Sequence, residues 1–136
     1  MLSDIRIHGC PAPENITLVQ RLKPMIGRIV TVFQPGFPRL TRTTGKLTNV
    51  SSTSFIVGET QVVIKTSFFI VLNSAVKSVK SFDLTATAEE IGSLKGKLIR
   101  VGKDFVEFVQ APETKVPTIF PLNQFTEVNC EHKDGE

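Results

Sequence analysis

Short runs of alternating apolar and polar residues, separated by segments rich in Gly, Pro and Ser, make up most of this chain. That pattern is typical of β-strands joined by turns. Residues 26–33 (IGRIVTVF) and 67–72 (SFFIVL) are apolar on nearly both faces and predict buried strands. FIV and QVVIK flank Gly-Glu-Thr and predict a hairpin at residues 55–65. The pattern therefore predicts a small all-β fold.

One short helix is expected near the N-terminus, because Leu18, Val19 and Leu22 lie at helical spacing after a candidate N-cap, Asn15 or Thr17. Pro24 should end it after two turns at most. Residues 4–9 (DIRIHG) alternate and are compatible with a short strand. The prolines of CPAPEN exclude regular structure, so residues 1–15 are expected to form an arm.

A six-residue motif occurs twice: GKLTNV at residues 45–50 and GKLIRV at residues 96–101. Phe55 and Phe105 follow the two motifs at similar distances, and each half ends on an apolar strand with an Asn. We interpret this order as an internal duplication. Residues 34–44 are expected to form a long turn, residues 80–87 a strand, residues 88–94 a helical turn and residues 105–109 an alternating strand.

The segments LKPMIGRIVTVF and GKLTNVSSTSFIV resemble the Sm-like small barrel, and more specifically the tandem Sm-like repeats of Bacillus-type spore-coat proteins (spore coat protein B-like). The resemblance covers residues 18–74 well and residues 89–129 loosely. It implies an Sm/SH3-like small barrel followed by a second, divergent barrel-like repeat, and a structural, assembling role. The corresponding divisions are an arm at 1–15, repeats at 16–78 and 79–130, and a polar tail at 131–136.

The RNA-binding Sm proteins carry an Asp and an Asn in a nucleotide pocket, and an Arg-Gly pair before their last strands. The matching positions in this chain hold Ser51 and, approximately, Phe55, and the later region reads IKTSFFIV without Arg or Gly. These departures disfavour an RNA-binding ring. Arg39, Arg42 and Lys46, with Arg28, are nevertheless compatible with a basic face on which Phe37 would stack on a base. A nucleic-acid-binding module is therefore an alternative function.

The two cysteines, Cys10 and Cys130, lie near opposite ends of the chain. Free thiols are the default in the cytosol. Both positions are expected to be exposed, which favours a disulfide between subunits under oxidising conditions. A bridge within one chain is also compatible with the sequence, because the termini of a domain often lie close together.

Residues 61–72 (QVVIKTSFFIVL) have high β-propensity, one charge and no Pro, so an exposed edge would pair readily with another strand. The alternative is a buried strand pair. The N-terminal arm is a second candidate for strand donation to a neighbour. The candidate assembly residues are Ile5, Ile7, Val62, Ile64, Phe68 and Ile70.

The remaining chemistry is sparse. The net charge of +3 permits contact with nucleic acid without arguing for it. His8 with Cys10, and Cys130 with His132, would need to converge to hold a metal, and we expect solvated terminal side chains instead. No phosphate-loop, dinucleotide or nucleophile-elbow motif occurs, so no cofactor and no enzymatic activity are expected.

The chain lacks a run of about 18 apolar residues, and its start does not resemble a secretory signal. We therefore expect synthesis in the cytoplasm and no membrane span. The leading hypothesis is a self-assembling structural protein of a bacterial spore surface layer, with copies of itself and other spore-coat proteins as partners. The alternatives are the nucleic-acid-binding module above, in the cytoplasm, and an adaptor that recruits one other protein through an edge strand.

Overall fold

The computed structural model describes residues 6–34, 41–66, 68–73, 82–88, 92–110 and 116–132. This part of the chain is all-β with one short N-terminal helix, as the sequence predicts. The strands are β1 (Arg6–His8), β2 (Ile29–Gln34), β3 (Thr41–Thr48), β4 (Ser54–Val57), β5 (Thr60–Val63), β6 (Phe69–Val71), β7 (Phe82–Ala88), β8 (Gly92–Val101), β9 (Phe105–Val109), β10 (Pro117–Pro121) and β11 (Phe125–His132).

The helix α1 (Leu18–Leu22) begins at Thr17, whose hydroxyl accepts from the Gln20 amide while the Gln20 side chain accepts from the Thr17 amide. This capping box satisfies two amides that a helix start leaves free. Leu18 and Leu22 are buried. Pro24 turns the chain into the 3₁₀ turn η2 (Lys23–Met25), so the predicted Thr17 cap and the predicted end at Pro24 are both confirmed.

The strands pair in the order β1-β11-β7-β8-β9-β10-β6-β2-β3-β4-β5. Two halves of this sheet have the same internal order. In the first half β6 pairs with β2, and β3, β4 and β5 follow. In the second half β11 pairs with β7, and β8, β9 and β10 follow. We call α1 with β2–β6 the first unit, since Leu18 and Leu22 pack in its core, and β7–β11 the second unit.

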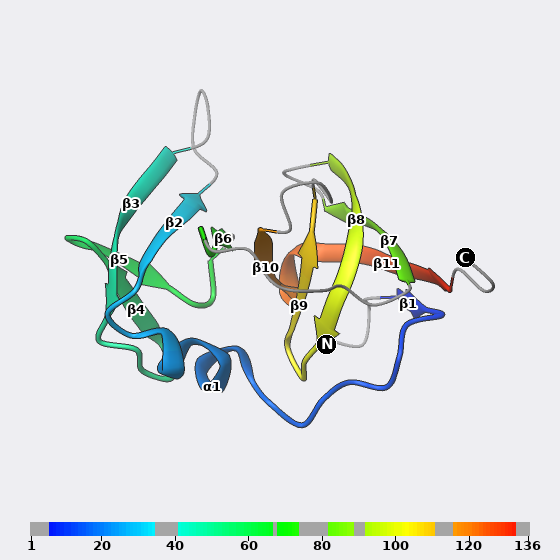
Figure 1. The fold of residues 1–136 in the computed structure, drawn as a ribbon, viewed down its shortest axis with the longest axis horizontal. Coiled ribbons are helices and arrows are strands. Elements are labelled where there is room, and N and C mark those ends of the chain that lie inside the picture. Colours follow the sequence, from blue (N-terminus) through cyan, green and yellow to red (C-terminus); the bar gives the residue numbers. More distant parts are fainter. Residues whose placement is uncertain are drawn as a thin grey trace.

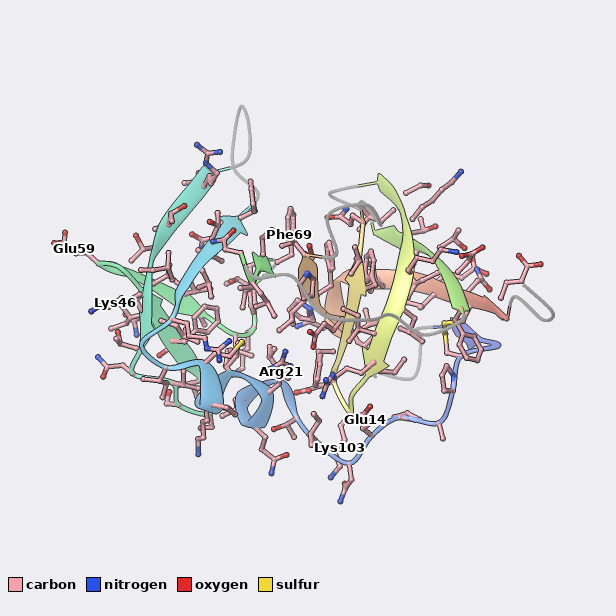
Figure 2. All side chains as sticks on the ribbon, in the orientation of Figure 1. Glu14, Arg21, Lys46, Glu59, Phe69 and Lys103 are labelled. Atoms are coloured by element: carbon pink, nitrogen blue, oxygen red, sulfur yellow. A yellow bond between two sulfur atoms is a disulfide. The ribbon has the colours of Figure 1, made fainter. Side chains whose placement is uncertain are left out.

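The two units join where β6 pairs antiparallel with β10 (Figure 1). Thr118 lies opposite Val71 and Ile119 opposite Ile70. A row of stacked rings crosses the same junction, with centroid distances of 4.8 Å for Phe33–Phe69, 4.8 Å for Phe69–Phe120 and 5.0 Å for Phe108–Phe120. Figure 2 shows Phe69 in the middle of the molecule, between the units. Cross-strand aromatic pairs stabilise a sheet beyond their buried area.

Each unit has its own hydrophobic core, and each core takes residues from the other unit. Phe105 and Ile119 of the second unit pack in the first core, around Leu22, Leu47 and Phe55. Phe69 of the first unit packs in the second core. The predicted division between residues 78 and 79 lies outside the described residues.

Three local predictions differ from the structure. Thr41–Thr44 belong to β3 instead of a turn, because this threonine-rich stretch pairs with β2. Residues 92–94 belong to β8 instead of a helical turn, since they pair with β7. β9 is buried at all five positions, although FVEFV alternates. Its two faces are covered by different cores, with Phe105 in the first and Phe108 in the second.

Candidate assembly edges and the interface between the two units

The first open end of the sheet is β5, which pairs with β4 on one side and with no described strand on the other. Val57 and Thr60 close a two-residue hairpin at Gly58–Glu59, and Gln61 lies opposite Ile56. Hydrogen-bonded and non-hydrogen-bonded pairs alternate along such a hairpin. Both backbone groups of Gln61 and the N–H of Val63 therefore face outward, while the Val63 carbonyl accepts from the amide and the hydroxyl of Thr66.

The side chains along β5 make this edge unusual. Gln61 is exposed, Val63 is 44% exposed, and the strand contains neither a charge nor a proline. Edge strands in natural proteins are normally protected by short length, charges, prolines or bulges, and of these β5 has only its short length of four residues. β5 is therefore an edge of a kind that pairs with another strand.

The side chains predicted to mediate assembly lie mostly inside the protein. Val62, Phe68 and Ile70 are fully buried in the first core, and Ile64 packs partly against it. The buried position of these side chains agrees with the alternative given for this segment, a buried strand pair. A contact through this segment would therefore use the backbone of β5 and the exposed Gln61 and Val63, which the apolar pattern did not single out.

The second end of the sheet is β1, which pairs parallel with β11 of the same chain. Arg6, Ile7 and His8 lie opposite Glu127, Val128 and Asn129 respectively. The expected strand in the arm therefore exists, and it pairs within its own chain instead of with a neighbour. The predicted assembly residue Ile5 lies outside the described residues.

A disulfide joins Cys10 to Cys130, with an Sγ–Sγ distance of 2.01 Å and a Cα–Cα distance of 4.7 Å. The sequence favoured a bond between subunits, and the structure has the bond within one chain. Cys130 is not an exposed terminal residue: β11 continues through it, it pairs with Leu84 of β7, and it is buried in the second core. The parallel β1–β11 pairing brings Cys10 to this position.

Gly9, between β1 and Cys10, fixes the arm against β11. Its φ of 76° is a conformation that L side chains rarely adopt. A Cβ at this position would lie 2.3 Å from the carbonyl oxygen of Cys130. The arm therefore contacts β11 closely only because residue 9 has no side chain.

Beyond Cys10 the N-terminal segment runs beneath the second unit and enters α1 of the first unit (Figure 1). The Glu14 amide donates to the Val101 carbonyl, and the Lys103 amide donates to the Ile16 carbonyl. The Leu18 amide donates to Oδ1 of Asp104 at 2.7 Å. The turn between β8 and β9 therefore caps and positions the helix of the other unit.

A buried ion pair also links the units. Arg21 of α1 donates to the fully buried Glu107 of β9 through Nε and one terminal nitrogen, at 2.8 and 3.0 Å. Arg100 Nε lies 3.4 Å from the same carboxylate without forming a hydrogen bond, and another Arg100 nitrogen lies 3.6 Å from Glu14. The four charges sum to zero.

The hydrogen bond with the Glu107 carboxylate is the main cause that raises the pKa of Arg21, and the partial burial of the guanidinium opposes it. Arg21 therefore stays charged at any ordinary pH. This pair was not predicted from the sequence, although the lone Glu inside the apolar FVEFV is a signal for it, since a fully buried carboxylate needs a partner.

The residues of the alternative nucleic-acid face are only partly described. Arg42, Thr44 and Lys46 occupy every second position of β3, and all three are exposed. Arg28 is exposed as well. Figure 2 shows Lys46 on the side of the first unit away from the second. Arg39 and Phe37 lie outside the described residues.

A hollow lies on β7 and β8, and the described residues that line it are Asp83, Leu84, Thr85, Lys95, Gly96, Lys97, Gln110 and Glu131. Lys97 pairs with Asp83 there. The described residues contain no group of three or more His, Cys, Asp and Glu that would hold a metal ion. No helix in the described ranges is long and apolar enough to span a membrane.

Comparison of the chain with protein-family models, with curated proteins and with solved structures finds no match. Function is therefore inferred from the sheet edges, the interface between the units and the disulfide.

Proposed function

We propose that this protein is a self-assembling structural subunit, joined to further copies of itself by pairing of edge strands, in a surface layer of a bacterial spore. The observation that carries the proposal is the uncharged, proline-free edge of β5 at the end of a sheet. Strand addition at such an edge needs only backbone groups in an extended conformation and a compatible side-chain surface.

The junction inside the chain supports assembly of this kind. There the fourth strand of the second unit, β10, pairs with the last strand of the first unit, β6. β5 is the fourth strand of the first unit, and so it occupies the place in its unit that β10 occupies in the other. A strand that follows the pattern of β6 would therefore extend the sheet beyond β5.

A duplicated unit is part of this proposal. The glycines of the two GKL motifs, Gly45 in β3 and Gly96 in β8, both lie where the backbone is crowded. A Cβ on Gly45 would lie 2.6 Å from the Gly58 Cα, and one on Gly96 would lie 2.5 Å from the Val109 carbonyl oxygen. Leu47 and Leu98, two residues later, are both fully buried. Equivalent residues thus have equivalent surroundings in the two units.

The disulfide supports a position outside the reducing cytosol, where such bonds persist. It closes a loop with a sequence separation of 120 residues, and so it restrains nearly the whole unfolded chain. An outer spore layer, exposed after the mother cell lyses, is such an environment. The resemblance to spore-coat repeats points to the same place, and it makes other spore-coat proteins further candidate partners.

Gln61→Pro tests the proposal, because it removes an outward-facing N–H of β5. Gln61→Ala is the matched control, since both variants lose the hydrogen bond from the Gln61 side chain to Ser54 but only the first loses the backbone donor. Sedimentation velocity and negative-stain microscopy, run both with and without reductant, should show assemblies for wild type and Gln61→Ala in at least one of the two redox states.

Gln61→Pro should remain monomeric under every condition. Wild type that stays monomeric at high concentration in both redox states would refute the proposed function. Equal assembly by the two variants would refute the role of β5.

A second candidate function is nucleic-acid binding, favoured by the exposed Arg42, Lys46 and Arg28 on and beside β3. Phosphate contacts make such binding weaken steeply with salt. A titration of single-stranded RNA and DNA at low salt tests it. Binding that weakens on Arg42→Ala and Lys46→Ala would favour this function, and no binding by wild type would remove it.

A further inference from the structure

We propose that β1 is a removable cover over β11, held by the Cys10–Cys130 disulfide, and that reduction frees β11 to pair with β5 of a second copy. This inference rests on the proposed assembly function and names the two edges that meet. The resulting contact would repeat, between chains, the β6–β10 junction that already joins the two units within one chain.

The position of β1 carries the inference. β6 is flanked by β2, the first strand of its unit, and by β10. β11 is likewise flanked by β7, the first strand of its unit, and by β1. β1 therefore occupies on β11 the place that β10 occupies on β6. Without β1, the sheet would end in β11 on one side and in β5 on the other. These two strands correspond to β6 and β10, which pair at the internal junction.

The pairing of β1 is weak by itself. It comprises three residues, and it is parallel, whereas the other described pairings of the sheet are antiparallel. Parallel pairing is slightly less stable per residue. Features that hold the arm next to it include the contact of Gly9 with the Cys130 backbone, the packing of Cys10 against the second core and the disulfide. The disulfide is the one that chemistry can switch.

The opening step is an ordinary thiol–disulfide exchange. A dithiol reductant supplies two electrons and two protons, the Cys10–Cys130 bond breaks into two thiols, and the dithiol becomes its own disulfide. β1 can then leave β11 without breaking a covalent bond. In its place β5 of another copy offers Thr60–Val63, an uncharged strand of four residues where β1 has three.

In this arrangement oxidation limits assembly, which is the opposite of the effect expected from the sequence. There, oxidation was expected to join subunits. Here, an oxidised copy keeps β11 covered while its β5 stays open, and so it can add to a growing chain through one edge only. Oxidised copies would therefore stop elongation at one end, and reduced copies would propagate it at both.

A mixing experiment without reductant tests this mechanism. Cys10→Ser/Cys130→Ala should assemble by itself, and oxidised wild-type protein should remain small. Adding one oxidised wild-type molecule per ten variant molecules should shorten the assemblies severalfold in negative-stain images and in sedimentation. Oxidised protein that carries Gln61→Pro is the matched control, and it should leave the length unchanged because it cannot offer β5.

Assemblies of equal size from oxidised wild type and the double variant would overturn the cover while leaving the assembly function intact. Oxidised dimers that are lost on Gln61→Pro would indicate β5–β5 pairing and would overturn it as well. The absence of assembly in every sample would overturn the proposed function itself.

Gly9→Ala provides a second test of the cover, and it leaves both cysteines and both edge strands unchanged. A Cβ at residue 9 collides with the Cys130 carbonyl, so under reducing conditions the arm should dock more weakly than in wild type. Assembly should then begin at a several-fold lower protein concentration. Hydrogen exchange in residues 126–130 of dilute, monomeric reduced protein should be faster in the variant. Unchanged exchange and an unchanged threshold concentration would contradict the cover.

Discussion

At the scale of single residues, Glu107 has the largest consequence for the molecule. Its carboxylate is fully buried, and it accepts two hydrogen bonds from Arg21 of the other unit. Arg100 lies beside it with a buried Nε that has no hydrogen-bond partner. Removing the acid would therefore leave two cations without their shared countercharge, which costs more than the loss of one hydrogen bond.

Glu107→Gln should lower the free energy of unfolding by about 3 kcal/mol, near the lower end for breaking a buried ion pair, because Arg21 keeps partial access to water. Glu14→Gln is the matched control: its carboxylate is 44% exposed and 3.6 Å from Arg100, so it should cost under about 1 kcal/mol. Urea unfolding measures both. Equal losses would show that the buried pair contributes no more than the exposed one.

The repeated glycines belong to a motif from which the sequence predicts a duplication, without a reason for glycine at either position. The atoms that crowd Gly45 and Gly96 come from other strands and turns. Those atoms are 2.5 to 2.7 Å from an added Cβ. No pattern within the motif contains that information, because the contact is tertiary.

Gly45→Ala should destabilise the protein by about 2 kcal/mol, because the added methyl group meets the backbone of Gly58, which cannot rotate away as a side chain would. Lys46→Ala, at the exposed neighbouring position, should change stability by less than about 0.5 kcal/mol. Thermal unfolding by circular dichroism separates the two. A Gly45→Ala protein as stable as wild type would contradict the close approach.

At the scale of elements, the sequence predicted most strands and the helix because their signals are local. The Thr17 cap, the Pro24 stop and the hairpin at Gly58–Glu59 depend on neighbouring residues only. The docking of β1 was not predictable in the same way, since Ile7 meets Val128 from the opposite end of the chain. The cysteines marked both partners, and nothing in the sequence distinguished pairing within a chain from pairing between chains.

Removal of the disulfide by Cys10→Ser/Cys130→Ala should lower the free energy of unfolding by roughly 2–5 kcal/mol, the usual range for a native disulfide. The size of the loop, with a sequence separation of 120, places this protein toward the upper end. Denaturant unfolding of the variant, beside oxidised wild type, gives the value. A loss under about 1 kcal/mol would mean that the bond restrains the unfolded chain far less than its loop size implies.

At the scale of the whole molecule, two units with one strand order share a continuous sheet, and each contributes to the core of the other. The sequence indicated the two units through the repeated motif. It did not indicate that β6 and β10 pair, because Ile70 and Ile119 are buried apolar residues with no feature that assigns them to each other. The sheet ends, on which assembly depends, follow from that pairing.

Hydrogen exchange on the Cys10→Ser/Cys130→Ala protein, measured by mass spectrometry over a range of protein concentrations, tests edge-to-edge assembly most directly. Exchange of the amides in residues 60–63 and 126–130 should slow together as protein concentration rises, because β5 of one copy and β11 of the next protect each other. Slowing of both segments over the same concentration range would establish the contact. Exchange in these segments that does not depend on concentration, or protection that rises elsewhere while they stay unchanged, would contradict it.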